Sequence, residues 1–229
     1  MQGGFKQKLF DQFALVGKAL GNGNRLELLE FLAQGERSVE TLSRLANLSI
    51  ANASQHLRTL RQAGLVSAVK RGQHVFYSLK DEAIVELLGL VRSISEKNLA
   101  EVDRLVQTYL KVKDDLEPVP ADELLERVKQ GLVIVLDVRP PEEFASGHVP
   151  GAVNVPLKKL EERLDLLKQK KEVIAYCRGP YCVLAFDAVA KLREKGFSAR
   201  RLEDGFPEWK KAGLPVETGP GESEVSGQS

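Results

Sequence analysis

The sequence lacks the features that mark a secreted or membrane-inserted protein. Among its 229 residues there are two cysteines, too few for the disulfide scaffold of a small secreted domain. No apolar stretch approaches the roughly 18 residues that a membrane-spanning helix needs. The first helical segment mixes charged with apolar side chains, unlike a secretory signal. We therefore expect a cytoplasmic protein that has no membrane partner.

The sequence also has little excess of charge of either sign, since its formal net charge is +1. Its distribution is uneven, because the segment from Arg37 to Lys80 holds seven basic residues and a single acidic one, Glu40. Such a segment is either a solvated basic face or a surface that binds phosphates. The motifs around it have to decide between these two interpretations.

The chain divides near residue 116 into two halves with different patterns. The first half is helical with one hairpin, whereas in the second half apolar runs alternate with helical stretches, as in a parallel α/β fold. Pro118 and Pro120 mark a short stiff linker, and the Gly/Ser/Glu-rich end predicts a disordered tail. The predicted parts are a helical domain with a β-wing at 1–113, a linker at 114–121, an α/β domain with a parallel sheet at 122–216 and a tail at 217–229.

Two short helices joined by a tight turn stand out in the first half. Ser38 can cap the first of them, and the second, in the segment IANASQHLRTLRQAG, places Ala53, Leu57 and Leu60 on its inner face. This is the pattern of a helix-turn-helix. Two further helices are expected upstream, at 5–20 and 25–34.

A hairpin and a long helix follow. Alternation around Arg71-Gly72-Gln73, in the segment LVSAVKRGQHVFYSL, predicts a β-hairpin with a basic tip. A helix is expected from about Asp81 to Lys113, with apolar residues at helical spacing over about eight turns. One small domain cannot cover so long a stripe, whereas a homodimer can.

This layout resembles the ArsR/SmtB family of winged helix-turn-helix repressors over residues 5–113, most specifically in the segment SIANASQHLRTLRQAGLVSAVKRGQHVFYSL. The resemblance implies a dimer that binds inverted repeats in double-stranded DNA, with the second helix of the motif in the major groove and the wing across the backbone. Candidates for contacts with base edges or nearby phosphates are Asn52, Ser54, Gln55 and His56. Candidates for phosphate or groove contacts are Arg58, Arg61, Arg71 and His74.

The sequence departs from the family's metal sensors. Residues 38–41 hold no cysteine pair, and residues 81–113 contain no histidine. The three histidines of the chain, His56, His74 and His148, stand far from one another and from the cysteines in the sequence. We therefore expect neither a metal site of those kinds nor a cofactor.

In the second half, Cys177 lies where a predicted strand, EVIAYC, ends and a helix begins. Open α/β sheets place ligands at that edge. Several segments with their spacing resemble the rhodanese domain across residues 120–215. They are Asp137-Val138-Arg139, Glu142-Glu143-Phe144, Gly147 to Ala152 with Asn154 and Pro156, the loop that Cys177 opens, and Gly205-Phe206-Pro207-Glu208-Trp209. Asp204 departs from the pattern, which usually has a second glycine there.

The rhodanese resemblance implies that Cys177 carries a sulfane sulfur as a persulfide. A thiolate among loop N–H groups at a helix N-terminus is stabilised by their partial positive charge, to which Arg178 can add. Pro180 removes one N–H from the loop. Because Val183 stands where the related phosphatases and arsenate reductases have an arginine, that chemistry is disfavoured. The candidate catalytic residues are Cys177, Arg178, Gly179, Tyr181 and Cys182.

Cys182 has two interpretations. It is either a small core residue at the start of a helix or a resolving thiol that attacks a persulfide or sulfenic acid on Cys177 and closes a disulfide.

Three functions remain open from the sequence. The favoured one is a DNA-binding regulator, a repressor, whose Cys177 senses reactive sulfur or an oxidant and thereby changes dimer geometry on DNA. The second is a sulfurtransferase that uses a small donor such as thiosulfate or polysulfide, with an accessory DNA-binding domain. The third is a rhodanese domain that serves as a non-catalytic interaction module.

Overall fold

The computed structural model describes residues 2–167 and 171–219. It divides the chain into two compact units, Met1–Leu90 and Val91–Ser229. The division falls inside one helix, α5 (Ala83–Asn98), whose first half belongs to the N-terminal unit and whose second half belongs to the C-terminal unit. The domain boundaries expected from the motifs stay predictions.

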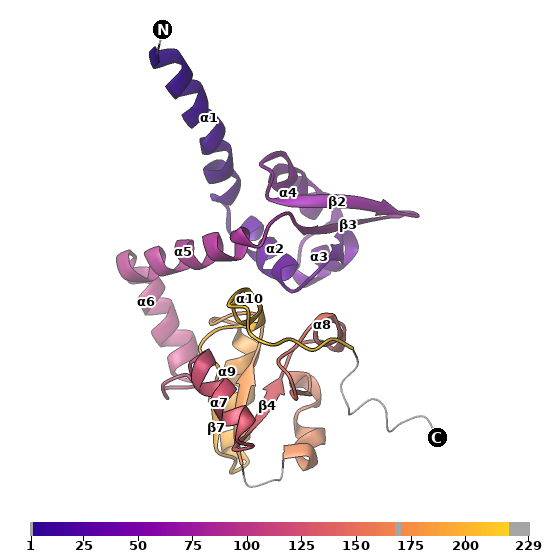
Figure 1. The fold of residues 1–229 in the computed structure, drawn as a ribbon, viewed down its shortest axis with the longest axis vertical. Coiled ribbons are helices and arrows are strands. Elements are labelled where there is room, and N and C mark those ends of the chain that lie inside the picture. The colour runs from indigo at the N-terminus through magenta and orange to yellow at the C-terminus, as the bar shows by residue number, and fades with distance from the viewer. Residues whose placement is uncertain (1, 168–170, 220–229) are drawn as a thin grey trace. The chain divides into compact units, whose positions relative to one another are not determined.

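The N-terminal unit joins four helices and the start of α5 with a small antiparallel sheet, of which β2 and β3 are seen in Figure 1. The strand order of this sheet is β1-β3-β2. The pairing of β1 with β3 is an addition to the predicted hairpin. The elements are α1 (Gln2–Leu20), α2 (Gly23–Ala33), β1 (Arg37–Ser38), α3 (Val39–Leu45), α4 (Ile50–Gln62), β2 (Val66–Arg71) and β3 (His74–Leu79).

The helix-turn-helix prediction is confirmed by α3 and α4. The Ser38 hydroxyl accepts a hydrogen bond from the Thr41 N–H at 3.3 Å, and the Ser49 hydroxyl accepts one from the Asn52 N–H at 3.2 Å. Each serine thereby satisfies an N–H that has no partner within its helix. The turn between the helices passes through Asn47, whose φ of +51° lies in the left-handed region that asparagine tolerates.

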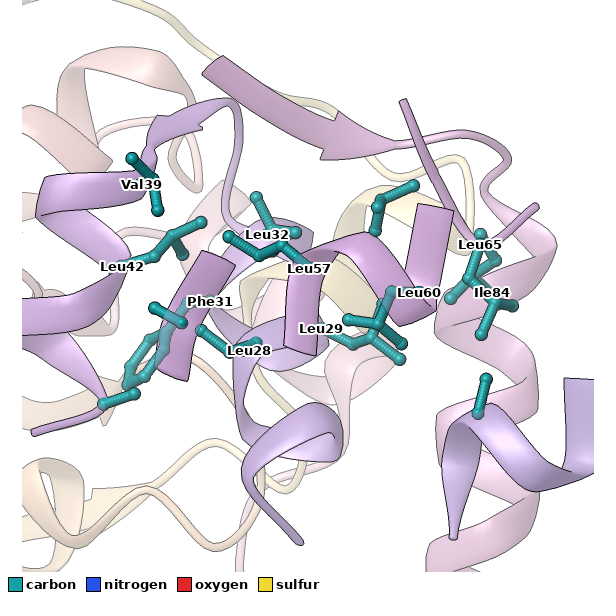
Figure 2. Packing of buried hydrophobic residues seen from close by; sticks show 14 residues of the cluster. Leu28, Leu29, Phe31, Leu32, Val39, Leu42, Leu57, Leu60, Leu65 and Ile84 are labelled. Carbon is teal, nitrogen blue, oxygen red and sulfur yellow. The ribbon is translucent and has the colours of Figure 1, made fainter. Parts of the chain in front are cut away.

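The core of the N-terminal unit is built from leucines on the inner faces of its helices (Figure 2). Ala53, Leu57 and Leu60 of α4 are fully buried, as the sequence predicts, because positions three and four apart share one helix face. Each buried leucine contributes about 1.5–3 kcal/mol through the apolar surface it removes from water. Ile84 of α5 joins this core. The core therefore fixes α4 so that its other face is exposed.

The expectation of one helix from Asp81 to Lys113 is wrong. The helix breaks at Leu99, whose backbone is extended (φ −113°, ψ 101°). The Asn98 side chain donates to the Ile94 carbonyl at 2.8 Å, and the Leu99 N–H still donates to the Ser95 carbonyl at 2.8 Å, so the helical bonding of α5 continues to Leu99. A side chain that bonds to the backbone in this way is typical of asparagine near helix ends. After the break come α6 (Ala100–Val106) and a π-helical turn, η1 (Gln107–Lys111).

The C-terminal unit contains a parallel sheet in the order β5-β4-β6-β7. The sequence predicts strands in the segments LVIVLDVR, AVNVP, EVIAYC and ARRLE, and the four strands of the sheet confirm them. The sequence also predicts a loop after the first of these strands and a helix after the second. Both of these expectations are wrong, because α8 forms in place of the loop and 3₁₀ turns form in place of the helix. The elements are α7 (Ala121–Lys129), β4 (Val133–Asp137), α8 (Pro141–Ser146), β5 (Val153–Asn154), η2 (Leu157–Lys159), η3 (Glu161–Leu167), β6 (Glu172–Tyr176), α9 (Val183–Glu194), β7 (Ala199–Arg201) and α10 (Phe206–Lys211).

The central strand β4 is buried on both faces, as its continuous apolar run predicts. Ile134 and Leu136 pack into one core with α9, whereas Val133 and Val135 pack into a second core with Leu124 of α7 and with α8 and α10. Alternate residues of a strand point to opposite faces, so the one strand serves both cores. The sheet thereby holds the carboxyl ends of β4 and β6 side by side.

The predicted disordered tail starts too early. The backbone of Glu217 exchanges two hydrogen bonds with that of His148, at 2.9 and 3.0 Å. The rest of the expected tail, from residue 220, lies outside the described residues. Among the described helices, none has both the length and the apolar composition required to cross a lipid bilayer.

Candidate functional site

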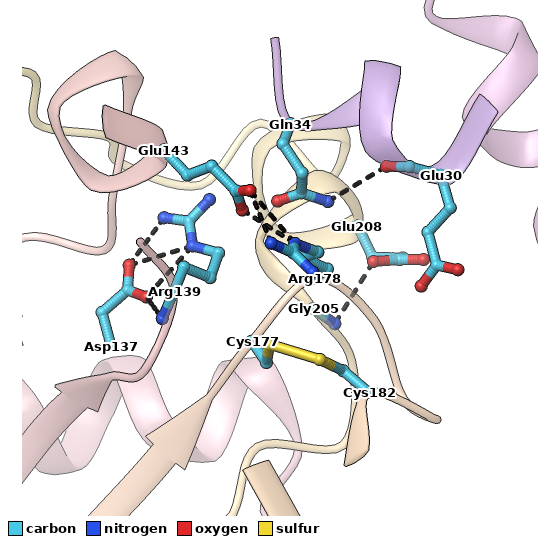
Figure 3. Close-up of a disulfide and its surroundings, with 10 residues drawn as sticks. All are labelled: Glu30, Gln34, Asp137, Arg139, Glu143, Cys177, Arg178, Cys182, Gly205 and Glu208. Carbon is cyan, nitrogen blue, oxygen red and sulfur yellow. Dashed lines mark hydrogen bonds and ion pairs between the residues drawn. A yellow bond between two sulfur atoms is a disulfide. The ribbon is translucent and has the colours of Figure 1, made fainter. Parts of the chain in front are cut away.

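The cysteine loop, residues Cys177 to Cys182, connects β6 with α9, as predicted. Its two cysteines are joined by a disulfide, with their Cα atoms 6.1 Å apart (Figure 3), within the roughly 7 Å reach of such a bond. Cys177 is buried, and Cys182 is the N-cap residue of α9. Both sulfur atoms therefore lie at the N-terminal end of a 12-residue helix, where partial positive charge favours a thiolate.

Arg178 binds Glu143 of α8 (Figure 3). Its Nε lies 3.1 and 3.0 Å from the two carboxylate oxygens, and its Nη2 lies 2.8 Å from Oε1. The side chains are 13% and 2% exposed, so this pair is shielded from water. Because Glu143 neutralises the guanidinium, Arg178 offers a sulfur anion less positive charge than the sequence alone indicates. Its contribution to thiolate stability stays a prediction.

A fully buried ion pair closes the carboxyl end of β4, next to β6. Arg139 Nη2 lies 2.6 Å from Asp137 Oδ2 and donates a second bond to the Gly147 carbonyl at 2.8 Å. The guanidinium also lies over the ring of Phe206, 4.3 Å from its centroid. Burial opposes the charge, but Asp137 outweighs it and raises the pKa of Arg139. The pair stabilises the backbone that flanks the cysteine loop.

Gly205 presses directly against the cysteine loop. A Cβ atom at this position would lie 2.4 Å from the backbone carbonyl of Arg178 and from the Gly179 nitrogen, closer than any side chain tolerates. The next residue, Phe206, donates its N–H to the Cys177 carbonyl at 3.0 Å. The glycine of this motif is therefore required by close backbone approach.

Replacing Gly205 with alanine should displace the cysteine loop. Because both neighbours are backbone atoms that cannot rotate away, we expect overpacking to cost about 1–3 kcal/mol. Denaturant unfolding followed by fluorescence of Trp209, the single tryptophan, measures this in the C-terminal unit. Gly17→Ala in α1, where a Cβ has nothing within 4 Å, is the control. A Gly205→Ala midpoint equal to that of the control would contradict the close approach.

Two residues of α5 also touch this region, and no pattern in the sequence signals them. Arg92 Nη1 lies 3.3 Å from Glu208 Oε1, and the Tyr181 hydroxyl interacts with the Glu96 carboxylate. Burial and this interaction raise the pKa of Tyr181, so that the phenol stays protonated. Asp204, the departure from the rhodanese pattern, is partly buried, and burial raises the pKa of its carboxyl.

The predicted DNA-contact residues of the first half gather on the outer face of α4 and on the wing. Asn52, Gln55, Arg58 and Arg61 are exposed, whereas Ser54 and His56 are half-buried. On the wing, Arg71 and His74 stand opposite each other in the register of β2 and β3. Arg71 pairs with Glu36, with 3.0 Å between Nη2 and Oε2, and His74 Nδ1 lies 3.3 Å from Glu40 Oε1. Because these pairs are exposed, a phosphate can compete with the carboxylates.

No group of three His, Cys, Asp or Glu side chains that could hold a metal ion occurs within residues 2–167 and 171–219. The expectation of no metal and no cofactor stays a prediction.

Two family models match the chain. One, described as "Bacterial regulatory protein, arsR family", covers residues 22–68, and the other, described as "Rhodanese-like domain", covers residues 120–212. The HTH-type transcriptional regulator Rv0324 of Mycobacterium tuberculosis is 42% identical over 93% of this chain and 94% of its own length. The predicted fold of both halves is thereby confirmed.

Other proteins resemble one half each. A sulfurtransferase of Allochromatium vinosum is 29% identical over 37% of this chain and 78% of its own length. Among solved structures, the homodimeric winged helix-turn-helix DNA-binding domain of Mb0332 from Mycobacterium bovis is 40% identical, with a TM-score of 0.39. The match covers 41% of this chain and 87% of that chain.

Proposed function

Because this chain belongs to the ArsR family of bacterial transcriptional regulators and carries a rhodanese-like domain, we propose that it is a homodimeric repressor that senses reactive sulfur through Cys177. The single observation that carries the sensing proposal is the disulfide between Cys177 and Cys182, at the end of β6 and the start of α9. A regulator of this kind acts on double-stranded DNA in the cytoplasm.

The DNA-binding part of the proposal rests on α4 and the wing. The exposed face of α4 carries the polar and basic side chains that read base edges and phosphates in helix-turn-helix proteins. Dimerisation is supported by apolar side chains that the single chain leaves exposed. On α1, Phe5, Phe10 and Phe13 are 72%, 54% and 59% exposed, and on α5 Ile94 is 62% exposed. A second copy of the chain would cover them.

The sensing chemistry uses both cysteines and a polysulfide as the oxidant. The Cys177 thiolate attacks a sulfur of hydrogen disulfide (HSSH), so that a Cys177 persulfide forms and hydrogen sulfide leaves. The Cys182 thiolate then attacks the Cys177 sulfur of the persulfide, expelling a second hydrogen sulfide and closing the protein disulfide. In total the two thiols are oxidised, and the two sulfur atoms of the donor are reduced to hydrogen sulfide.

A sulfurtransferase is the second candidate, and the likeness to the Allochromatium protein favours it. The geometry of Arg178 speaks against it, because Glu143 occupies the one cation of the cysteine loop. A dianionic donor such as thiosulfate would meet little positive charge there. A resolving cysteine five residues away would also consume the persulfide before an external acceptor reached it.

Mass spectrometry of the full-length protein tests the sensing chemistry. Reduced protein treated with polysulfide should lose two hydrogens per chain, as Cys177 bonds to Cys182. Cys182→Ser should instead keep an added sulfur on Cys177, because nothing resolves the persulfide. An unmodified Cys177 in both proteins would overturn the proposal. Steady turnover of thiosulfate with cyanide as acceptor would instead favour the sulfurtransferase function.

A further inference from the structure

The second half of α5 is bound to the cysteine loop from two sides. On one side, Arg92 pairs with Glu208 at 3.3 Å. The other carboxylate oxygen of Glu208 accepts the Gly205 N–H at 3.2 Å, and Gly205 lies against the backbone of Arg178 and Gly179. Each of these links is a direct contact, so α5 and the loop backbone are connected through α10.

On the other side, the Glu96 carboxylate interacts with the hydroxyl of Tyr181, the residue that precedes Cys182. Glu96 and Arg92 are four residues apart and therefore share one face of α5. A movement of Cys182 moves Tyr181 with it, because the two are consecutive. A change at Cys182 would therefore be passed to Tyr181.

The first half of the same helix belongs to the N-terminal unit. Ile84 is buried in that unit's core, and Leu88 packs against it. One helix therefore joins the core beneath α4 at one end with the cysteine loop at the other.

We propose that Glu96 and Arg92 are positioning residues through which α5 reads the state of the cysteine loop. This proposal rests on the proposed function. In the oxidised protein the disulfide holds Cys182 in place, so that the Tyr181–Glu96 and Arg92–Glu208 contacts fix the second half of α5. When the disulfide is reduced, taking up two electrons and two protons from a dithiol, Cys182 and Tyr181 are released and α5 loses that support. The DNA-binding unit receives the change through the continuous helix.

The test compares the reduced and the polysulfide-treated forms of full-length variants. The probe is a DNA duplex that the wild-type protein has selected from a random-sequence library, called here the selected duplex. In the wild type we expect the Kd values of the two forms to differ at least about fivefold, the lower range of coupling between sites. In Glu96→Ala the difference should fall below about twofold, while mass spectrometry shows the disulfide forming as in the wild type.

Two variants serve as controls. Glu96→Gln keeps a side-chain oxygen that can accept from the Tyr181 hydroxyl. The difference between the Kd values of the two forms, which is lost in Glu96→Ala, should therefore largely return. If only the negative charge of Glu96 mattered, the difference would stay small in Glu96→Gln as well. Glu101→Ala removes an exposed carboxylate of α6 that pairs with Arg104, and it should behave as the wild type.

The outcomes separate the two proposals. A wild-type difference that persists in Glu96→Ala overturns the positioning role alone, whereas equal Kd values for both wild-type forms overturn the sensing proposal itself. Amide hydrogen exchange of the wild type gives a check that needs no variant. Residues 91–98 should exchange faster after reduction, and unchanged exchange there would count against the positioning role.

Discussion

Replacing Asp137 with alanine should destabilise the C-terminal unit by about 3–5 kcal/mol, the cost of leaving one partner of a buried ion pair without the other. Asp137 and Arg139 are both fully buried, so no water can solvate the guanidinium once the carboxylate is gone. The hydrogen bond to the Gly147 carbonyl cannot neutralise the charge. The free energy of unfolding is measured by denaturant titration with Trp209 fluorescence, because that side chain is buried in the C-terminal unit.

The size of this effect comes from burying the Arg139 charge without the Asp137 carboxylate, and a second variant tests this. In the double variant Asp137→Leu/Arg139→Met no charge is left, so the unit should be more stable than Asp137→Ala. Glu101→Ala breaks an exposed ion pair and should leave the midpoint where it is. If Asp137→Ala unfolded at the wild-type midpoint, the pair would have no structural role.

Replacing side chains on the outer face of α4 with alanine should weaken DNA binding in two distinguishable ways. Arg58→Ala removes a side chain that is predicted to bind a phosphate, so affinity should fall for every duplex. The slope of log K against log salt should then decrease by about 1 for each phosphate that is no longer neutralised. Gln55→Ala removes a side chain that is predicted to read a base. It should therefore cost about 1–3 kcal/mol on the selected duplex and little on a scrambled one. Because a homodimer carries two copies of α4, the change in slope and the loss of binding free energy are each counted twice.

The control for this pair is a cation outside the N-terminal unit. Lys159 of η2 is exposed, and Lys159→Ala should keep both the affinity and the salt slope of the wild type. Fluorescence anisotropy with labelled duplexes at several salt concentrations gives both quantities. Equal slopes for Arg58→Ala and Lys159→Ala would show that Arg58 does not contact a phosphate.

Most of the fold could be predicted from the sequence because its signals are local. The spacing of Ala53, Leu57 and Leu60 gives α4, and the apolar run of β4 gives a strand buried on both faces. The break at Leu99 could not be predicted from periodicity, because the apolar stripe continues across it. What ends α5 is the extended backbone of Leu99, which the apolar pattern does not reveal.

The candidate site could be predicted in part. Cys177, its loop and the helix that follows are consecutive, so the motif and its spacing place them. The partners of the loop are distant in the sequence. Glu143 pairs with Arg178, and Glu96 interacts with Tyr181. Neither pairing leaves a local pattern, because only the tertiary fold brings these groups together.

The role of Cys177 is tested most directly by the Kd of the selected duplex before and after polysulfide treatment, in the wild type and in Cys177→Ser. If Cys177 is the sensor, treatment changes the wild-type Kd at least about fivefold and leaves that of Cys177→Ser unchanged. A wild-type Kd that polysulfide does not alter, or an equal change in Cys177→Ser, would contradict sensing through this cysteine.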